Sequence, residues 1–254
     1  MPLSATVGAV TTLFDPAAGV LRIRHAALAV LARLATAPTD IRLHDHDIAP
    51  LVAEFRGAGL LGAAGIHPDV APLAQAIGSA HTVGDVTATN HGTLMGARLW
   101  VAGDLLVVGV ATTVPPHTYE LMADEPRAGE LLLSDLVGLG SAPEPPDGVG
   151  RELALEAFDG LVAADAAVEP EDVARALGPD ADGAWARALA DGLRGSPVRW
   201  RLIAHRDGGR LLDMEVLDAG ASGLWLAERG DGTAVVAQVT PRAVRERFAT
   251  LLHE

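Results

Sequence analysis

Residues 197–239 read PVRWRLIAHRDGGRLLDMEVLDAGASGLWLAERGDGTAVVAQV, and this stretch decides the fold of the chain. It contains four runs in which apolar and β-branched residues alternate with polar ones, as they do in half-buried strands. Turn residues separate the runs at Asp207-Gly208-Gly209, at Gly220 and at Gly230-Asp231-Gly232. Strands joined by such short turns pair antiparallel. The stretch therefore predicts an antiparallel meander with strands at 197–206, 209–219, 222–229 and 233–239.

A second run of strands lies earlier in the chain, and one helix follows each run. The earlier strands are expected at 82–90, 93–102, 104–114 and 117–124. The two helices are expected at 125–140 and 240–254, and Pro-Arg-Ala lies near the start of both. Thr240 is the expected N-cap of the last helix, with Pro241 in its first position. The same tripeptide at the same joint indicates a repeated unit.

Helical periodicity precedes each run of strands. The expected helices cover 20–35, 47–65, 67–80, 151–166, 169–178 and 180–195. Residues 141–150 are rich in Pro and form the clearest linker. We infer a single domain over residues 1–254, made of two pseudo-repeats at about 47–140 and 151–254 and related by a pseudo-twofold axis. The competing interpretation is an accidental similarity between two α+β segments.

The predicted fold class is α+β. Two meandering units would most simply share one continuous central antiparallel β-sheet. The helices are then expected at the ends of this sheet or on one of its faces.

The composition excludes several classes of protein. The formal net charge of −14 repels phosphate backbones and argues against nucleic acid as a partner. No long apolar stretch lacks charge and no basic region opens the chain, so we expect no membrane insertion, no signal peptide and a cytoplasmic location. The absence of Cys excludes disulfides, a thiolate nucleophile and a Cys-based zinc site. All basic residues are Arg, which with abundant Ala and Gly is typical of a high-GC genome such as that of an actinomycete.

Residues 42–48, RLHDHDI, look like a metal site. On a strand, His44 and His46 would share one face and could both bind one metal ion. A catalytic metal usually needs a third ligand, and the other histidines show no His-x-x-x-His spacing. The alternative is a polar loop in which Asp47 caps a helix that begins at Ile48. We assign no metal and no cofactor from these patterns.

No catalytic motif is evident elsewhere in the sequence. Gly-x-Ser-x-Gly is absent, and the glycine-rich stretches 57–65 and 230–233 lack the register of a phosphate-binding loop. We therefore expect no enzymatic activity. The four Trp residues fit core packing, but Trp100 lies three residues before the turn at Gly103 and could border an exposed hairpin tip. A sheet domain with apolar hairpins and strong negative charge is suited to binding another protein.

The second half of the chain resembles the EspG family, the cytosolic proteins of ESX (type VII) secretion systems. The resemblance rests on Arg199-Trp200 at the opening of a strand, on MEVLDAGASGLW from Met214 to Trp225, and on VTPRAV before the last helix. The stretch AGLLGAAGIHPDVAPLAQAI, followed by strand hairpins, is similar to the first half of the family. The resemblance covers roughly residues 55–254, and the first fifty residues match the family's opening strand and helix less well.

The resemblance implies a quasi-twofold α+β fold in which helical bundles flank a central antiparallel sheet. It also implies a chaperone that binds the helical tip of a PPE protein in its PE–PPE pair, keeps it soluble and presents it for secretion. Hairpin loops of the sheet and the C-terminal helical bundle hold the cargo in such proteins. Trp100, which could border the hairpin tip, is added to the residues that the resemblance implies. The candidate partner-binding residues are then Arg98, Trp100, Gly103, Asp104, Trp185 and Arg187.

We therefore expect a non-enzymatic cytosolic chaperone or adaptor that binds a helical secretion substrate, either PPE-like or of the WxG type. The chaperone itself is expected to be a monomer or a weak homodimer. One alternative is a metal-dependent hydrolase that uses His44 and His46; stoichiometric bound metal would favour it. Another alternative is a self-assembling structural protein, which a defined homo-oligomer would reveal.

Overall fold

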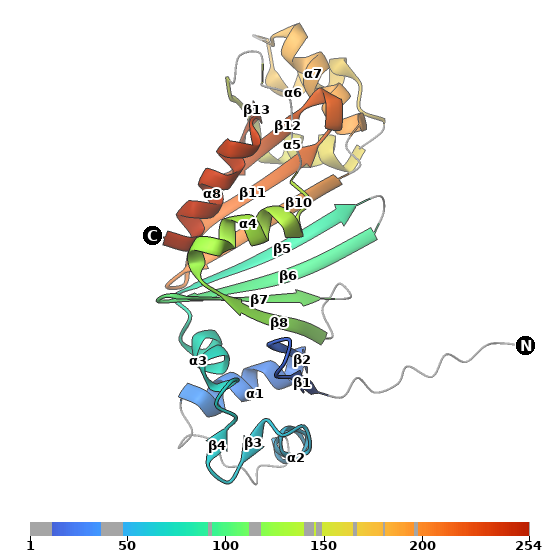
Figure 1. Cartoon of the computed structure of the whole chain (residues 1–254). Helices are drawn as coiled ribbons and strands as arrows, with labels where there is room; N and C mark the ends of the chain where they lie inside the picture. Colours follow the sequence, from blue (N-terminus) through green and yellow to red (C-terminus); the bar gives the residue numbers. More distant parts are fainter. Residues whose placement is uncertain are drawn as a thin grey trace, which may run out of the picture. The chain divides into compact units, whose positions relative to one another are not determined.

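The computed structural model describes residues 12–36, 48–90, 93–111, 118–139, 145, 149–164, 167–179, 181–195 and 198–253 (Figure 1). The chain divides into two compact units. Unit 1 consists of residues 1–81 and 96–124, and unit 2 of residues 82–95 and 125–254. The chain passes from one unit to the other after residues 81, 95 and 124, and the second of these crossings lies inside strand β6, Thr93–Ala102.

Eleven strands follow one another in the hydrogen-bonded order β1-β2-β8-β7-β6-β5-β10-β11-β12-β13-β9. Every strand pair with a described register is antiparallel, which confirms the predicted α+β fold class. The strand bounds are β1 Leu13–Asp15, β2 Val20–Arg24, β5 Thr82–Asn90, β6 Thr93–Ala102, β7 Leu105–Ala111, β8 Thr118–Asp124, β9 Arg151–Ala154, β10 Val198–Arg206, β11 Gly209–Asp218, β12 Leu224–Arg229 and β13 Thr233–Val239.

Helices lie close to where the sequence predicts them. Their bounds are α1 His25–Thr36, α2 Ala49–Gly57, α3 Ala71–Ser79, α4 Pro126–Leu136, α5 Leu155–Ala164, α6 Pro170–Leu177, α7 Gly183–Gly195 and α8 Pro241–His253, with a short 3-10 helix, η3, at Gly220–Ser222. The predicted start of the last helix is confirmed. The Thr240 hydroxyl oxygen accepts a hydrogen bond from the backbone N–H of Ala243 at 3.2 Å, which satisfies a free donor of the first turn.

Three helix predictions were wrong at their ends. Residues 20–24 form β2 rather than the first turns of a helix, and residues 151–154 form β9. Residues 61–66 form a small hairpin of β3, Leu61–Gly62, and β4, Gly65–Ile66, in place of a helix end. In β2 the alternation is that of a strand, because Leu21 and Ile23 are fully buried beside exposed Arg22. These segments are short, and helical residues adjoin them, which hid the alternation.

In unit 1, α1 and α3 pack against each other beside the sheet. A glycine allows this contact, because a Cβ atom at Gly78 would lie 2.9 Å from the carbonyl oxygen of Ala32. A carboxylate joins further elements of the unit. Glu54 of α2 accepts hydrogen bonds from the Arg24 side chain of β2 and from the backbone N–H of Thr12 at 3.2 Å. Burial opposes the negative charge, but these hydrogen bonds outweigh it and hold the pKa of Glu54 below its ordinary value.

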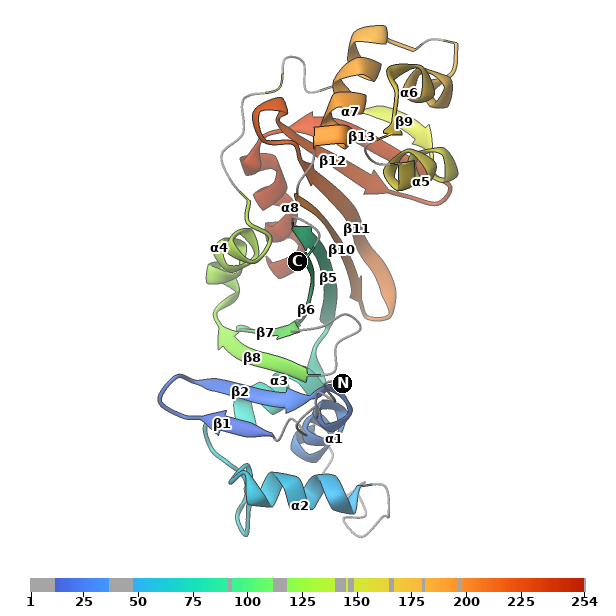
Figure 2. The same cartoon turned by 90° about the vertical axis from the view of Figure 1, so that its right-hand side faces the viewer.

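In unit 2, one face of the sheet packs on α8. Side chains alternate along β10, so Trp200, Leu202 and Ala204 share this face, and all three are buried. The Trp200 ring lies 5.5 Å from the ring of Phe248 in α8. Helix α4 packs beside α8. Figure 2 shows α4 and α8 on one side of the unit 2 strands and α5 on the other.

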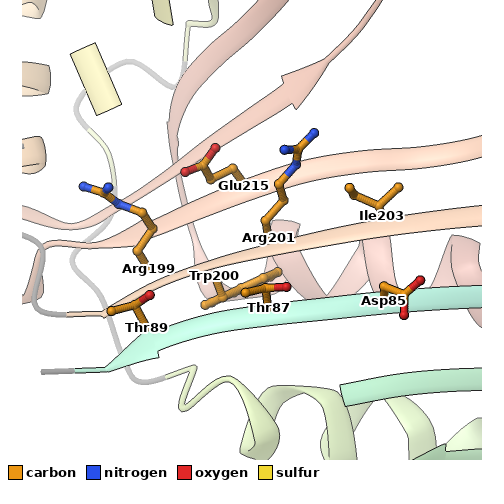
Figure 3. A pocket seen from close by; sticks show the side chains of 8 residues that line it. All are labelled: Asp85, Thr87, Thr89, Arg199, Trp200, Arg201, Ile203 and Glu215. Atoms are coloured by element: carbon orange, nitrogen blue, oxygen red, sulfur yellow. The ribbon is translucent and has the colours of Figure 1, made fainter. Parts of the chain in front are cut away.

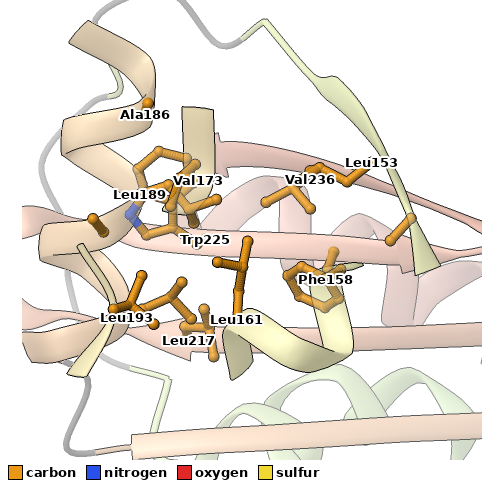
Figure 4. Packing of buried hydrophobic residues seen from close by; sticks show 14 of the residues in the cluster. Leu153, Phe158, Leu161, Val173, Ala186, Leu189, Leu193, Leu217, Trp225 and Val236 are labelled. Atoms are coloured by element: carbon orange, nitrogen blue, oxygen red, sulfur yellow. The ribbon is translucent and has the colours of Figure 1, made fainter. Parts of the chain in front are cut away.

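Among the described elements, helices cover the opposite face of the same sheet toward β9, β12 and β13. Helices α5, α6 and α7 lie there over an apolar cluster (Figure 4). Trp225 of β12 is 1% exposed and meets Trp185 of α7 edge to face, with ring centroids 5.5 Å apart. Gly192 of α7 touches the same indole, because a Cβ atom there would lie 2.5 Å from its Nε1. The other cluster members include Leu153, Phe158, Leu161, Val173, Leu189, Leu193, Leu217 and Val236.

The described elements occur twice in one order. A strand, three helices, four strands and one helix follow one another from β2 to α4, and again from β9 to α8, if the β3–β4 hairpin and η3 are set aside. We propose that this order reflects the duplication inferred from the sequence. The order favours a first copy that begins at Val20 rather than near residue 47.

Candidate functional site

A polar hollow of about 330 Å³ lies on the unit 2 sheet (Figure 3). We call it the polar slot. The residues that line it are Asp85, Thr87 and Thr89 of β5, Arg199, Trp200, Arg201 and Ile203 of β10, and Glu215 of β11. Most of these side chains lie on the face opposite the one that packs on α8, because they alternate along β5 and β10 with buried residues.

Strand register brings the polar side chains of the slot together. Thr87 lies opposite Arg201 in the β5–β10 pair, and Arg201 lies opposite Glu215 in the β10–β11 pair. Thr89 lies opposite Arg199 in the same way. A row of cross-strand neighbours therefore crosses the three strands and ends at the edge of the apolar cluster.

Arg201 forms a bidentate ion pair in the slot. Its Nε and Nη2 atoms donate to the two carboxylate oxygens of Asp213, both at 2.9 Å. The Asp213 side chain is only 2% exposed, and Arg210 approaches it at 3.6 Å. A nearly buried carboxylate is thus neutralised by two guanidinium groups, and their loss would leave a buried charge without compensation.

Glu215 is neutralised from the other side. Its Oε2 accepts a hydrogen bond from Arg229 of β12 at 2.7 Å, and both side chains are 6% exposed. Arg229 also pairs with Asp159 of α5 at 2.6 Å and lies 5.3 Å from the Phe158 ring centroid. Burial opposes the charge on Arg229, but the hydrogen bonds to Asp159 and Glu215 outweigh it and raise the pKa of Arg229. The guanidinium therefore stays charged and ties α5 to the sheet.

Arg199 also connects the slot to α5. Its Nη1 donates to the carbonyl oxygen of Val162 at 3.1 Å. The side chain of this residue is half-buried, as are those of Arg201 and Asp85. The slot is therefore a partly open surface, formed where no described helix covers this face of β5 and β10, beside the helix-covered part of the sheet.

Four of the residues predicted to bind a partner lie in unit 1. Arg98 and Trp100 belong to β6, and Gly103 and Asp104 form the exposed turn before β7. Trp100 is only 5% exposed and meets the ring of Tyr119 edge to face, with centroids 6.0 Å apart. Its side chain is therefore a core residue and presents little surface to a partner.

The other two predicted residues lie on α7 in unit 2. Trp185 is 6% exposed and packs on Trp225, so it too is a core residue. Arg187 is exposed. Of the six predicted residues, the exposed ones are thus Gly103, Asp104 and Arg187, with Arg98 half-buried. Partner binding by these residues stays a prediction.

The predicted metal ligands His44 and His46 and the predicted cap Asp47 lie outside the described residues. Within the part of the chain that the structure describes, no three His, Asp or Glu side chains are grouped as metal ligands require. Helix α2 has Ile48 as its N-cap, without a side-chain hydrogen bond from that residue. In the same described ranges, no helix is long and apolar enough to span a bilayer.

A second hollow of about 500 Å³ lies along α5 and α6 in unit 2. Small and apolar residues line most of it, among them Ala157, Gly160 and Leu161. Asp172 and Arg175 of α6 also line it and pair with each other at 2.8 Å. Its lining is more apolar in character than that of the polar slot.

The sequence contained a signal for the polar slot that we did not use. In TVGDVTATN, the polar residues Asp85, Thr87 and Thr89 alternate with the buried residues Val86 and Ala88. The strand at 198–206 alternates in the same way. Two such strands predict a polar open face as well as a core face, but only pairing of β5 with β10 makes a single surface of them.

No protein-family model and no curated protein matches the sequence. A solved structure does match the fold: the Mycobacterium tuberculosis type VII secretion system chaperone EspG5 in complex with a PE25–PPE41 dimer. The TM-score is 0.59 at 14% sequence identity, and the match covers 92% of this chain and 95% of that chain. The chain thus has an EspG-like fold, which confirms the fold expected from the sequence resemblance.

Proposed function

We propose that this chain is a cytosolic, non-enzymatic chaperone or adaptor that binds a helical secretion substrate of the PE/PPE or WxG type. The observation that carries the proposal is the likeness of the fold, over nearly its whole length, to a chaperone solved with a PE25–PPE41 dimer. The described surface is consistent with binding. It offers an open polar slot and an apolar hollow on α5–α6, both within unit 2.

We place the main contact with the substrate at the polar slot. A sheet face that is left uncovered by helices offers a preformed and rigid surface, so little conformational entropy is lost when a partner binds. Two ion pairs fix its floor, Arg201–Asp213 and Arg229–Glu215. The hydroxyls of Thr87 and Thr89 add polar groups beside them. Exposed Arg187 on α7 and the turn at Gly103 and Asp104 are further proposed contacts.

Electrostatics would guide the choice of partner. The chain has a formal net charge of −14, so substrates with basic patches would associate faster than acidic ones. This contribution is screened by salt, whereas contacts inside the slot are screened less. We therefore expect the rate of association to fall with salt more steeply than the lifetime of the complex.

The test is affinity purification of the tagged full-length chain from its native host, followed by mass-spectrometric identification of the proteins that remain bound. The proposal predicts one stoichiometric helical protein, or a PE–PPE-like pair, that is then reconstituted from purified components. The same purification with Thr87→Trp should lose this protein, because a large side chain fills the slot. Thr93→Trp places the same side chain at an exposed strand position outside the slot and should retain it.

A preparation without any helical partner, repeated at low salt, would contradict the proposal. Metal analysis of the same preparation addresses the hydrolase alternative. The metal content of the native chain is compared with that of a variant in which His44 and His46 are both replaced by Ala. This comparison tests the two histidines whether or not a partner is bound.

A further inference from the structure

The charges around the polar slot balance. Among the residues that line it, Arg199 and Arg201 are basic and Asp85 and Glu215 are acidic. Arg201 donates to Asp213, which Arg210 also approaches, and Arg229 donates to Glu215 and pairs with Asp159. A fully charged group entering the slot would therefore meet both signs of charge. The entering group would lose its hydration without gaining a net counter-charge, and this desolvation is costly in a partly buried site.

Hydrogen-bonding capacity nevertheless remains in the slot. Arg201 uses Nε and Nη2 for Asp213, and its Nη1 has no acceptor among the described residues. Glu215 uses Oε2 for Arg229, and its Oε1 has no donor within the same described part of the chain. The remaining groups are therefore a donor on one side and an acceptor on the other.

Threonine hydroxyls complete this arrangement. Thr87 lies directly across the strand pair from Arg201, and Thr89 lies two residues further along, opposite Arg199. A hydroxyl can donate and accept at once. No hydrogen bond links either hydroxyl to another group in the ranges that the structure describes. The slot thus presents donor and acceptor groups side by side, without net charge.

The size of the slot limits what it can hold. Its volume of about 330 Å³ is at the lower end of the range for small-ligand pockets, which is roughly 300–1,000 Å³. One or two side chains, or a short turn of backbone, fit such a volume, whereas a whole helix with its side chains does not.

We propose that the polar slot is specific for a neutral amide of the partner, from an Asn or Gln side chain or an exposed peptide group. An amide places a carbonyl acceptor next to an N–H donor without net charge, on two separate atoms that can face the free donor and the free acceptor of the slot. Its oxygen would accept from Nη1 of Arg201, and its nitrogen would donate to Oε1 of Glu215 or to Thr87. Arg229 would act as a positioning residue, because it fixes one oxygen of Glu215 and leaves the other free.

This inference rests on the proposed function for the identity of the partner, but its test needs no partner. The full-length, isotope-labelled chain is titrated with propionamide, propionate and propylammonium, which represent amide, acidic and basic side chains. Backbone amide resonances report where each compound binds. We expect saturable shifts at Thr87, Thr89, Arg201 and Glu215 with propionamide, and binding about tenfold weaker for both charged compounds.

Five variants locate the effect. Thr87→Trp should abolish the shifts, Thr87→Val should weaken them without altering the fold, and Thr93→Trp should leave them unchanged. Arg229→Met should weaken propionamide binding, because Glu215 loses the partner that fixes one of its oxygens. Arg229→Lys keeps a positive charge beside Glu215 and should restore part of the binding.

Stronger binding of propionate or of propylammonium would overturn the proposal, as would the absence of localised shifts with all three compounds. These failures are distinct from failure of the proposed function. If the chain binds propionamide but retains no helical protein, the chaperone role is refuted and the amide specificity of the polar slot stands. A chain that retains its helical protein but ignores propionamide refutes the amide specificity alone.

Discussion

One face of the unit 2 sheet is built in two different ways. Toward β9, β12 and β13 it carries Trp225, Ala227 and Val236, and helices α5–α7 cover these side chains. Along β5 and β10 the same face carries Thr87, Arg201 and other polar residues, and it stays partly open. On this face, the described helices cover the strands whose side chains are apolar, because burying apolar area provides the free energy for packing.

The covered part should therefore tolerate truncation poorly. Replacing Trp225 by Ala removes a nearly fully buried indole and its edge-to-face contact with Trp185. We expect a loss of about 3–5 kcal/mol in the free energy of unfolding. Urea denaturation followed by circular dichroism measures it. A loss below about 1 kcal/mol would mean that α7 does not depend on this cluster.

The boundary between the two parts depends on one buried guanidinium. Arg229→Met leaves Glu215, whose side chain is 6% exposed, without its counter-charge. We expect a loss of about 3 kcal/mol, since removing one member of a buried pair is strongly destabilising. The double variant Arg229→Met, Glu215→Leu should recover most of it in the same denaturation experiment. Strictly additive losses would contradict the pairing.

Close approach of α7 to the sheet gives a smaller effect. Gly192→Ala would place a methyl group 2.5 Å from Nε1 of Trp225, so the helix or the indole must shift. Overpacking of this kind costs about 1–3 kcal/mol. The matched control is Gly160→Ala on α5, where an added Cβ meets no atom within 4 Å and should not destabilise. Equal effects at both positions would refute the close contact.

A half-buried carboxylate in unit 1, that of Glu54, shows how polar residues act when they hold structure together. The pKa of Glu54 is lowered in the folded state, from an ordinary value of 4.5. Its contribution to stability is therefore present above that value and is lost as the pH falls through the folded pKa. We expect Glu54→Gln to cost about 1 kcal/mol at neutral pH, and to lose part of the acid dependence of unfolding. An unchanged acid dependence would contradict this role.

The open part of the sheet face should have the smallest effect on stability. Thr87 is exposed, and its hydroxyl has no hydrogen bond to any residue that the structure describes. Thr87→Val keeps the β-branched shape, so the free energy of unfolding should change by less than about 0.5 kcal/mol. Thermal unfolding measures this change. A clear destabilisation would mean that the hydroxyl serves the fold rather than a partner.

The sequence predicted the strands better than the ends of the helices. Strands 82–90 and 93–102 were placed as the structure has them, because alternation and the turns around them mark both ends. The residues of β2 and β9 were assigned to helices, since four or five alternating residues do not stand out before a helical segment. Pairing decides their state, because β2 pairs with β1 and β8 and β9 pairs with β13. The sequence does not show which strands lie beside them.

The candidate site was harder to predict for the same reason. The aromatic residues that drew attention, Trp100 and Trp185, are core residues. The polar slot is formed by residues more than a hundred positions apart, and it exists because β5 pairs with β10. Alternation predicts that Thr87 and Arg201 each face away from the core, but not that they face each other.

Partner binding at the polar slot is tested most directly by calorimetry. The affinity of the purified chain for the helical protein that it retains in its host is measured for the native chain, Thr87→Trp and Thr93→Trp. We expect Thr87→Trp to weaken binding at least about a hundredfold, a change of about 2.7 kcal/mol, and Thr93→Trp to bind as the native chain does. Equal affinity of all three proteins would show that the partner binds elsewhere and would contradict the assignment of the polar slot.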